Sequence, residues 1–405
     1  MSEYQSTIKV VVDENIALPD SLSERLQLTV MPGRQILAHH VVDADALLVR
    51  SVTRVDSQLL QNSTVRFVGT ATSGTDHLDL PWLTGAGVTV ADAAGANAGA
   101  VTDYVLSCLA SLLQDRLINW QEMRVAVVGV GRVGSQLVRR LQALGVDCIG
   151  CDPFQRLVED LPYVPLSEAL QADVVCLHTP LTHEGDHPTR HMLDARRLAG
   201  IAPGTILINA GRGEVIDNQA LRAHAQMFPE RKFILDVWEH EPRPDTELLR
   251  LAYIATPHIA GYSRESKEQA GERIVQALYQ HFNIADIADV TDDGARNVGA
   301  SIKQGGATDN GANDATTSGG ILLSHAAQKV VAERISQCFS ASELSERFSR
   351  DYLAATTDAQ AADTFDRYRR EQLGRREFAA LPLPAGNLQG DIRRALTAAG
   401  FTVQR

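Results

Sequence analysis

Three charged residues of this sequence have side chains that can together carry out acid–base chemistry on an anionic substrate. Arg212 lies in INAGRGEVID, Glu241 in LDVWEHEP and His258 in ATPHIAG. A guanidinium can bind a carboxylate through two hydrogen bonds. Imidazole side chains ordinarily titrate near neutral pH and therefore serve as bases, and a carboxylate beside an imidazole favours its protonated form.

Each of these residues also has an ordinary structural explanation. An arginine after a strand is more often a surface charge, a glutamate before Pro242 is commonly a solvated turn residue, and a single histidine is usually a hydrogen-bonded structural group. All three nevertheless follow apolar runs that are typical of buried strands. Because the carboxyl ends of parallel strands border the ligand-binding crevice, we expect the three side chains to lie at one edge of a sheet.

A glycine motif precedes these residues. The segment VAVVGVGRVGSQLVRRLQALG places Gly129, Gly131 and Gly134 in the pattern G-x-G-x-x-G, between an apolar strand and an amphipathic helix. The first glycine permits a tight turn, the second lets the backbone approach a pyrophosphate, and the third allows close packing of the helix. The helix N-terminus attracts the anion. We therefore predict a dinucleotide site that includes the intervening Arg132 and Val133.

Asp152 lies 152 − 134 = 18 residues after the last glycine, beyond the next apolar run. A carboxylate there can bind the ribose hydroxyls and would repel a 2′-phosphate, so NAD is favoured over NADP. NAD accepts a hydride. Oxidation of a 2-hydroxy acid also needs a cation for the carboxylate, a base for the hydroxyl proton and a group that orients the base, and these can be Arg212, His258 and Glu241. The alternative is a Rossmann-like fold that binds no dinucleotide.

Two blocks of apolar runs predict the strands that position these residues. IKVVV, ALLVRSV, VRFVGTA and VTVAD fall between Lys9 and Val90, and VAVVG, DCIGC, DVVCL, TILIN, FILDV and YIATP fall between Arg124 and His258. Such near-continuous apolar runs, most of them separated by enough residues for a crossover helix, indicate strands of parallel sheets. Residues 98–113 and 263–282 have helical periodicity and can link the blocks. We predict an α/β fold with two Rossmann-like, doubly wound parallel-sheet domains.

The composition changes after Asp292. Residues 294–320 are rich in Gly, Ala, Asn, Ser and Thr, which predicts a flexible linker or loop. The predicted domains are 1–97 with 263–290 for substrate binding, 98–262 for NAD binding, and 321–405 as a smaller C-terminal domain. The basic run YRREQLGRREF is either a solvated helix face or an interface or phosphate-binding element.

Composition excludes several classes of protein. The chain has 405 residues and a formal net charge of −12, which argues against a general nucleic-acid binder. No signal peptide or membrane span is apparent, and five cysteines, an odd number, fit reduced thiols in the cytoplasm. Cys148 and Cys151 form a C-x-x-C, but a strand would direct them to opposite faces. We expect no metal site and no membrane partner.

At these segments the chain resembles the D-isomer-specific 2-hydroxy acid dehydrogenases. The resemblance covers about residues 8–290 and rests on GVGRVG, Asp152, HTPL, NAGRG, DVWEHEP and TPHIAG. It implies that Arg212, Glu241 and His258 are catalytic and that Asp152 binds the cofactor. It also implies that four residues line the nicotinamide side of the NAD site, namely Thr179, Ala210, Asp236 and Gly261.

Other segments are similar to one member of that family that acts on a small phosphorylated 2-hydroxy acid. They are VVDEN, ALLVRSVT, VGTATSGTDHLD, HIAGYSRESK and FDRYRREQLGRREF. By this resemblance Ser51, Thr72 and Tyr262 contact substrate, Arg50 is a neighbouring candidate for the phosphate, and the C-terminal α+β domain makes a homodimer. Residues 294–320 are longer than expected for that member.

Two alternatives stay open. The chain can be another D-2-hydroxy acid dehydrogenase, acting on phosphoglycerate or hydroxypyruvate, because such enzymes share the catalytic residues. It can also be an NAD-sensing scaffold or corepressor, although the presence of Arg212, Glu241 and His258 argues against a protein that has lost catalysis.

Overall fold

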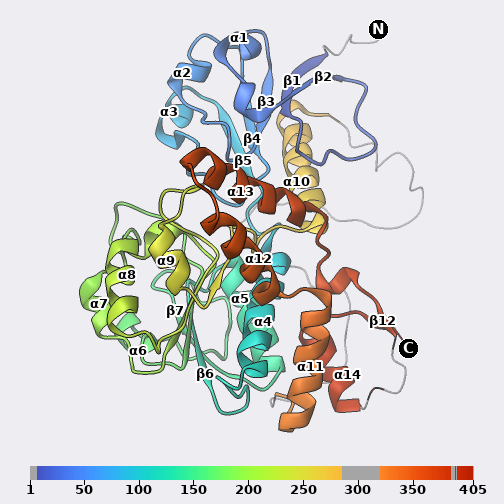
Figure 1. The fold of residues 1–405 in the computed structure, drawn as a ribbon. Coiled ribbons are helices and arrows are strands. Elements are labelled where there is room, and N and C mark those ends of the chain that lie inside the picture. Colours follow the sequence, from blue (N-terminus) through green and yellow to red (C-terminus); the bar gives the residue numbers. More distant parts are fainter. Residues whose placement is uncertain (1–6, 285–319, 385–387, 389, 405) are drawn as a thin grey trace. The chain divides into compact units, whose positions relative to one another are not determined.

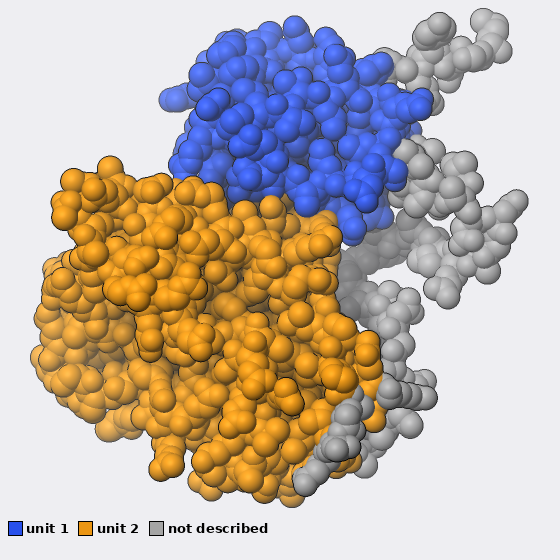
Figure 2. Space-filling model, turned by 45° about the vertical axis from the view of Figure 1, so that its right-hand side comes forward, with its two compact units in different colours: residues 1–70, 77–91, 271–319 blue, residues 71–76, 92–270, 320–405 orange. Residues whose placement is uncertain are grey.

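The computed structural model describes residues 7–284, 320–384, 388 and 390–404 (Figure 1). The chain divides into two compact units, shown in different colours in Figure 2. Of the described residues, unit 1 contains 7–70, 77–91 and 271–284, and unit 2 contains 71–76, 92–270 and those from 320 to 404. The predicted linker at 294–320 lies almost entirely outside the described residues. The predicted domain boundaries remain a prediction.

Unit 1 is built on a five-stranded sheet with the order β2-β1-β3-β4-β5. The strands are β1 (Ile8–Asp13), β2 (Leu26–Met31), β3 (Ala46–Val49), β4 (Phe67–Thr70) and β5 (Thr89–Asp92), the last ending at the unit border. β1 pairs in parallel with β2 and β3, and β3 with β4. Four of the strands were predicted. β2 was missed because Gln27 and Thr29 alternate with its apolar residues, so the segment has no continuous apolar run.

Short helices follow the strands of unit 1: α1 (Ala38–Val41), α2 (Ser57–Leu60) and α3 (Leu80–Gly85). Asp56 and Asp79 begin α2 and α3 by accepting hydrogen bonds from backbone amides of the first turn. The long helix α10 (Arg264–Phe282) passes from unit 2 into unit 1 and confirms the helix predicted at 263–282.

Unit 2 contains a six-stranded parallel sheet with the order β11-β10-β9-β8-β6-β7. Its strands are β6 (Arg124–Val128), β7 (Asp147–Cys151), β8 (Val174–Leu177), β9 (Ile206–Asn209), β10 (Phe233–Leu235) and β11 (Ile254–Ala255). All six were predicted. The strand order reverses between β6 and β8, and such a switch point opens a crevice beyond the carboxyl ends of the strands.

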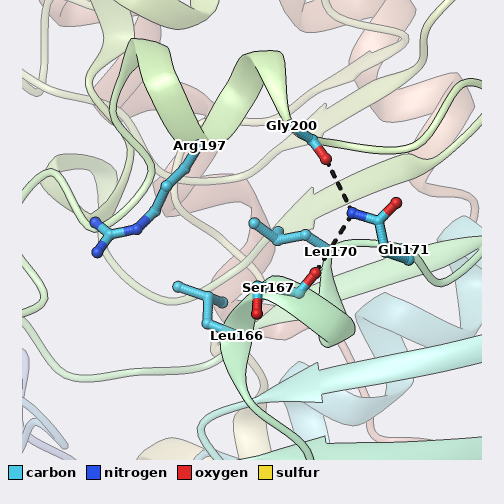
Figure 3. A pocket seen from close by; sticks show the side chains of 6 residues that line it. All are labelled: Leu166, Ser167, Leu170, Gln171, Arg197 and Gly200. Atoms are coloured by element: carbon cyan, nitrogen blue, oxygen red, sulfur yellow. Dashed lines mark hydrogen bonds between the residues drawn. The ribbon is translucent and has the colours of Figure 1, made fainter.

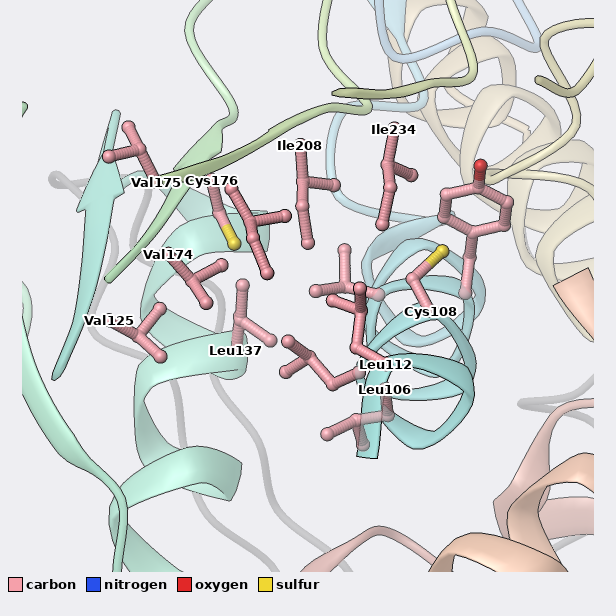
Figure 4. Packing of buried hydrophobic residues seen from close by; sticks show 14 of the residues in the cluster. Leu106, Cys108, Leu112, Val125, Leu137, Val174, Val175, Cys176, Ile208 and Ile234 are labelled. Carbon is pink, nitrogen blue, oxygen red and sulfur yellow. The ribbon is translucent and has the colours of Figure 1, made fainter. Parts of the chain in front are cut away.

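Helices cover this sheet because its apolar strands are buried on both faces. They are α4 (Ala98–Gln114), α5 (Arg132–Ala143), α6 (Leu166–Ala169), α7 (Ala195–Ala199), α8 (Asn218–Met227) and α9 (Thr246–Leu251). Figure 4 shows Leu106 and Leu112 of α4 pointing toward the sheet residues Val174, Ile208 and Ile234. The predicted linking helix at 98–113 is thus a core helix of unit 2.

The C-terminal segment belongs to unit 2 as well. It contains α11 (His325–Cys338), α12 (Ala341–Leu353), α13 (Asp358–Glu371), α14 (Gly390–Ala398) and the short parallel pair β12 (Leu383–Pro384) and β13 (Val403–Gln404). Its apolar residues share one core with the sheet. The hydroxyl of Ser107 on α4 donates to the Phe339 carbonyl at 2.7 Å, and the Ala255 amide donates to Ser345 Oγ at 2.8 Å.

The α/β fold class is therefore confirmed, with parallel sheets and a smaller C-terminal part of mixed helices and short strands. Among the described residues, no helix has both the length and the apolar character needed to cross a membrane.

Candidate active site

The glycine motif forms the turn between β6 and α5. Gly129 has a φ of +87°, a conformation that side chains disfavour, and a Cβ there would lie 2.8 Å from the backbone of Thr179. A Cβ at Gly134 would lie 2.1 Å from the Gly129 carbonyl oxygen. At Gly131 a Cβ would meet nothing within 4 Å, so this backbone faces open space. The geometry matches the three roles expected for the glycines.

Asp152 follows β7 and its carboxylate faces the same turn. Oδ2 accepts a hydrogen bond from the Val130 amide at 2.9 Å, and Oδ1 accepts from the amides of Phe154 and Gln155, each at 2.9 Å. The side chain is therefore held beside the glycine turn, as a ribose-binding carboxylate must be. Its three backbone contacts also give it a structural role that the sequence did not reveal.

Polar atoms without partners lie across the turn. Thr179, after β8, has a buried hydroxyl with no hydrogen bond among the described residues, and both ring nitrogens of His178 are likewise unpaired. Burial lowers the pKa of His178 to about 4, so its imidazole is neutral. Unpaired buried polar atoms ordinarily indicate a missing partner. Together with the open space at Gly131, the unpaired Thr179 hydroxyl fits a bound dinucleotide.

Glu241 and His258 form a hydrogen-bonded pair. Glu241 Oε2 lies 2.7 Å from Nδ1 of His258, and Oε1 accepts from the Trp238 amide at 2.9 Å. Glu241 follows β10 and His258 follows β11, two adjacent parallel strands whose carboxyl ends share one edge. The His258 side chain is 32% exposed and that of Glu241 22%. The carboxylate thus orients the imidazole through Nδ1 and leaves its other nitrogen, Nε2, without a hydrogen bond among the described residues.

The pKa of Glu241 lies below its usual value despite opposing contributions. Burial raises this pKa, but the charge and hydrogen bond of His258, the Trp238 amide and the charge of Arg369 together lower it. The carboxylate therefore stays ionised at neutral pH, which is what an orienting partner of a catalytic imidazole requires.

Asp236 holds the loop that carries His258. Its Oδ1 accepts from the Thr256 hydroxyl at 2.7 Å and the Ile259 amide at 2.8 Å, and its Oδ2 accepts from the Ala260 amide at 2.9 Å. The side chain is only 1% exposed. Asp236 was predicted to line the cofactor site, which stays a prediction; the structure shows that it holds the loop of His258. A Cβ at Gly261, on the same loop, would lie 2.6 Å from the Asn97 side chain.

Arg212 follows β9 and is fixed by a segment far away in the sequence. Its Nε donates to Oδ2 of Asp76 at 3.1 Å, and its Nη1 donates to the Gly211 carbonyl at 2.9 Å. A Cβ at Gly74 would lie 1.8 Å from Nη2 of Arg212, so the guanidinium occupies space that only glycine leaves open. Nothing in the sequence pattern pointed to Asp76 or Gly74 as partners of Arg212.

The loop of Arg212 packs against the loop of Glu241. A Cβ at Gly213 would lie 2.0 Å from the backbone of Trp238, the residue whose amide holds Glu241. Since β9, β10 and β11 are neighbours in the parallel sheet, the structure brings the three predicted catalytic residues to one edge. Their individual roles remain predictions.

The other predicted site residues are distributed over both units. Val133 is partly buried in the first turn of α5, and Arg132 donates to the Ala94 carbonyl at 2.5 Å. Ala210 follows β9 and packs against the core. In the loop of residues 71–76, Thr72 Oγ1 donates to the Gly74 carbonyl at 2.8 Å.

Tyr262, after the catalytic loop, accepts a hydrogen bond from Arg369 at 2.5 Å. Ser51 is exposed after β3 in unit 1. Beside it, Arg50 pairs with the buried Asp13, with Nε to Oδ2 at 3.1 Å and Nη2 to Oδ1 at 3.3 Å. This pairing fixes the guanidinium at the ends of β1 and β3.

Two other features carry no catalytic group. Cys148 and Cys151 both lie on β7 as predicted, and burial raises their pKa values to about 12 and 11, which disfavours reactive thiolates. Figure 3 shows a pocket in which Gln171 Nε2 donates to the Gly200 carbonyl at 2.9 Å. None of the predicted site residues lines this pocket.

Comparison with known proteins identifies the family and the fold of this chain. The model of the D-isomer specific 2-hydroxyacid dehydrogenase NAD binding domain matches residues 111–260. The D-lactate dehydrogenase of Aquifex aeolicus, solved with NAD and lactic acid, has a TM-score of 0.57 at 24% identity and covers 68% of this chain and 95% of its own. That likeness shows the fold alone.

Two relatives are much more similar in sequence. The erythronate-4-phosphate dehydrogenase of Chromohalobacter salexigens is 41% identical over 403 residues, which is 98% of this chain and 99% of the relative. The enzyme of the same name from Marinobacter nauticus is 49% identical over 280 residues, 68% of this chain and 73% of the relative. Because the first match spans nearly the whole of both chains, this chain belongs to the erythronate-4-phosphate dehydrogenases, within the D-isomer-specific 2-hydroxyacid dehydrogenase family.

Proposed function

We propose that this protein oxidises 4-phospho-D-erythronate with NAD to 2-oxo-3-hydroxy-4-phosphobutanoate, as a step in the biosynthesis of pyridoxal phosphate (vitamin B6). The observation that carries the proposal is the Glu241–His258 pair, whose oxygen and nitrogen lie 2.7 Å apart; a separate glycine turn with open space at Gly131 supports it. The full-length match to a relative named for this substrate supports the choice of substrate.

In the reaction, His258 accepts the proton of the C2 hydroxyl at Nε2, because Glu241 occupies Nδ1. Glu241 holds the ring in place and stabilises the imidazolium that forms. Arg212 binds the substrate carboxylate and polarises the oxygen that becomes the C2 carbonyl. NAD, when bound, supplies the acceptor for the hydride that leaves C2. Gly129, Gly131 and Gly134, with Asp152 and Thr179, hold the cofactor.

The decisive assay measures NADH formation by absorbance with three substrates: 4-phosphoerythronate, 3-phosphoglycerate and D-lactate. We expect kcat/KM to be highest by far with 4-phosphoerythronate. A preference for 3-phosphoglycerate or hydroxypyruvate would instead identify another D-2-hydroxy acid dehydrogenase. NAD binding without turnover of any 2-hydroxy acid would favour a scaffold or corepressor.

Asp152→Ala is expected to weaken NAD binding and to narrow the preference for NAD over NADP, because the carboxylate both binds ribose hydroxyls and repels a 2′-phosphate. Dissociation constants for both cofactors, measured by NADH and NADPH fluorescence, test this. Since Asp152 also accepts three backbone amides, Asp152→Asn is the matched control: it keeps an oxygen acceptor for Phe154 and Gln155 but loses the charge. Unchanged affinity and preference in both variants would remove Asp152 from the cofactor site.

Three further proposals rest on resemblance. Ser51, Thr72 and Tyr262 contact the substrate, and Arg50, oriented by Asp13, is placed to bind an anionic group.

The protein works in the cytoplasm, in keeping with five free cysteines among the described residues. It forms a homodimer through the C-terminal segment. Light scattering of the intact protein over a dilution series tests this, and a mass equal to one chain at all concentrations would contradict it.

A further inference from the structure

The C-terminal segment of the chain contacts the catalytic loop and the start of α10 at several points. Nη2 of Arg375 donates to the Ala260 carbonyl at 2.7 Å and to the Ala100 carbonyl at 3.0 Å. The Arg264 amide donates to the Arg375 carbonyl at 2.8 Å, and the Ser263 hydroxyl donates to Glu377 at 2.8 Å. The loop that carries His258 is therefore fixed from two sides, by Asp236 and by residues more than 100 positions later.

Arg369, on α13, contacts Tyr262, four residues after His258. Its Nη2 donates to the Tyr262 hydroxyl at 2.5 Å, and its guanidinium carbon lies 5.3 Å from the centre of the Tyr262 ring. Asp366 lies 3.6 Å from its Nη1, and the side chain is 19% exposed. Its Nε is buried with no hydrogen bond among the described residues. A largely buried guanidinium that lies over an aromatic ring and donates to its hydroxyl restricts the orientation of that ring.

The charge of Arg369 also acts on the catalytic pair. The charged and titratable groups that act on Arg369 include Tyr262, Glu241 and Asp366, and those that act on Glu241 include His258 and Arg369. Arg369 is one of the groups that lower the pKa of Glu241. A surface arginine would be screened by water, but a buried one is screened much less.

We infer that Arg369 is a positioning residue of the active site, which orients Tyr262 and places a fixed positive charge near the Glu241–His258 pair. The C-terminal segment thereby completes the catalytic centre of its own chain, whatever part it has in self-association. This inference rests on the proposed function of Glu241 and His258.

The direction in which the pH–rate profile shifts when the Arg369 charge is removed distinguishes this role from a purely structural one. A nearby cation makes it easier for the Glu241–His258 pair to release a proton. Removing the charge should therefore move the midpoint of the pH–rate profile to higher pH. Removing the Glu241 charge should move it to lower pH. General loosening of the loop would lower the rate without a matched shift of the midpoint.

The experiment compares Arg369→Gln and Arg369→Lys with Arg370→Gln, in the full-length protein. Arg370 is the matched control, because it is adjacent, 63% exposed and weakly paired with Asp363 at 3.7 Å. We expect Arg369→Gln to lower kcat/KM by about ten- to hundredfold, the usual effect of losing a hydrogen bond to a charged group. The midpoint of the pH–rate profile of Arg369→Gln should move to higher pH. Arg369→Lys should keep the midpoint near wild type, and Arg370→Gln should change neither quantity.

An unshifted midpoint with near-normal kcat/KM in Arg369→Gln would overturn the inference. If Arg369→Gln does not fold, as judged by thermal melting, Arg369→Lys is combined with Tyr262→Phe. Both changes alter the same contact between residues 369 and 262, so the double variant should lose little more than Tyr262→Phe alone, and additive losses would count against the contact.

A measurement that does not depend on turnover separates this inference from the proposed function. The titration of the His258 imidazole can be followed by NMR in the substrate-free protein. A higher midpoint in Arg369→Gln supports the positioning role even if 4-phosphoerythronate proves not to be the substrate. An unchanged midpoint rejects the role even if the wild-type protein oxidises that substrate.

Discussion

Replacement of His258 with Asn is expected to lower kcat by roughly a hundredfold to ten-thousandfold, the range typical for a lost general base, while NAD affinity stays near wild type. Asn is the better test residue because His258 has a φ of +55°, and Asn tolerates this conformation more readily than Ala. Steady-state NADH formation and a separate cofactor-binding titration measure the two quantities. The unchanged affinity serves as the internal control for folding.

His258→Ala should show a similar fall in kcat with an added loss of stability. If either variant retained near-normal turnover, His258 would not be the base, even though the Rossmann fold and the family assignment would stand.

In the wild-type protein, oxidation requires neutral imidazole, so the rate should rise with pH through one ionisation. This ionisation should vanish in both His258 variants.

Glu241→Gln should move that ionisation to lower pH. The lowered pKa of Glu241 means that its carboxylate is charged at neutral pH, where it stabilises the imidazolium form of His258 across the 2.7 Å hydrogen bond. Gln keeps the shape and a hydrogen-bonding oxygen but removes the charge, so the protonated imidazole loses its anionic partner. A pH–rate profile that did not move would contradict the role given to Glu241.

Arg212→Ala is expected to have the second large effect, raising KM and lowering kcat together. The guanidinium binds the substrate carboxylate in the ground state and stabilises charge on the C2 oxygen in the transition state, so both parameters should suffer. We expect kcat to fall by about a hundredfold to a thousandfold, as when a donor to a developing oxyanion is removed. Arg212→Lys should recover part of the loss in KM but little of kcat, because an ammonium lacks the bidentate geometry.

Asp76→Asn is the control for Arg212. It removes the charge that Nε of Arg212 contacts at 3.1 Å but leaves the guanidinium in place, so its effect on kcat should be much smaller. An Arg212→Ala variant with raised KM and unchanged kcat would show that Arg212 only binds substrate. Equal losses in Asp76→Asn and Arg212→Ala would show that the ion pair, rather than the guanidinium alone, is required.

Sequence by itself determined the features that depend on local pattern. The continuous apolar runs identified ten of the eleven strands in the two larger sheets, because strands covered on both faces must be apolar along their length. The glycine spacing identified the turn before α5, because only a residue without a side chain fits at Gly129 and Gly134. The same local patterns placed Arg212, Glu241 and His258 after β9, β10 and β11. The edge strand β2 was missed because its polar residues Gln27 and Thr29 interrupt the apolar run.

Tertiary structure alone decided which distant residues hold these groups in place. Asp76 and Gly74 fix Arg212 from 136 and 138 positions away, Asp236 holds the His258 loop, and Arg369 reaches Tyr262 across 107 positions. The physical reason is that hydrogen bonds and close packing depend on distances in space, whereas periodicity and motif spacing report only on neighbours along the chain. The basic run of residues 368–378 can therefore be a solvated helix face or an interface until the fold places Arg369 and Arg375 against the His258 loop and Tyr262.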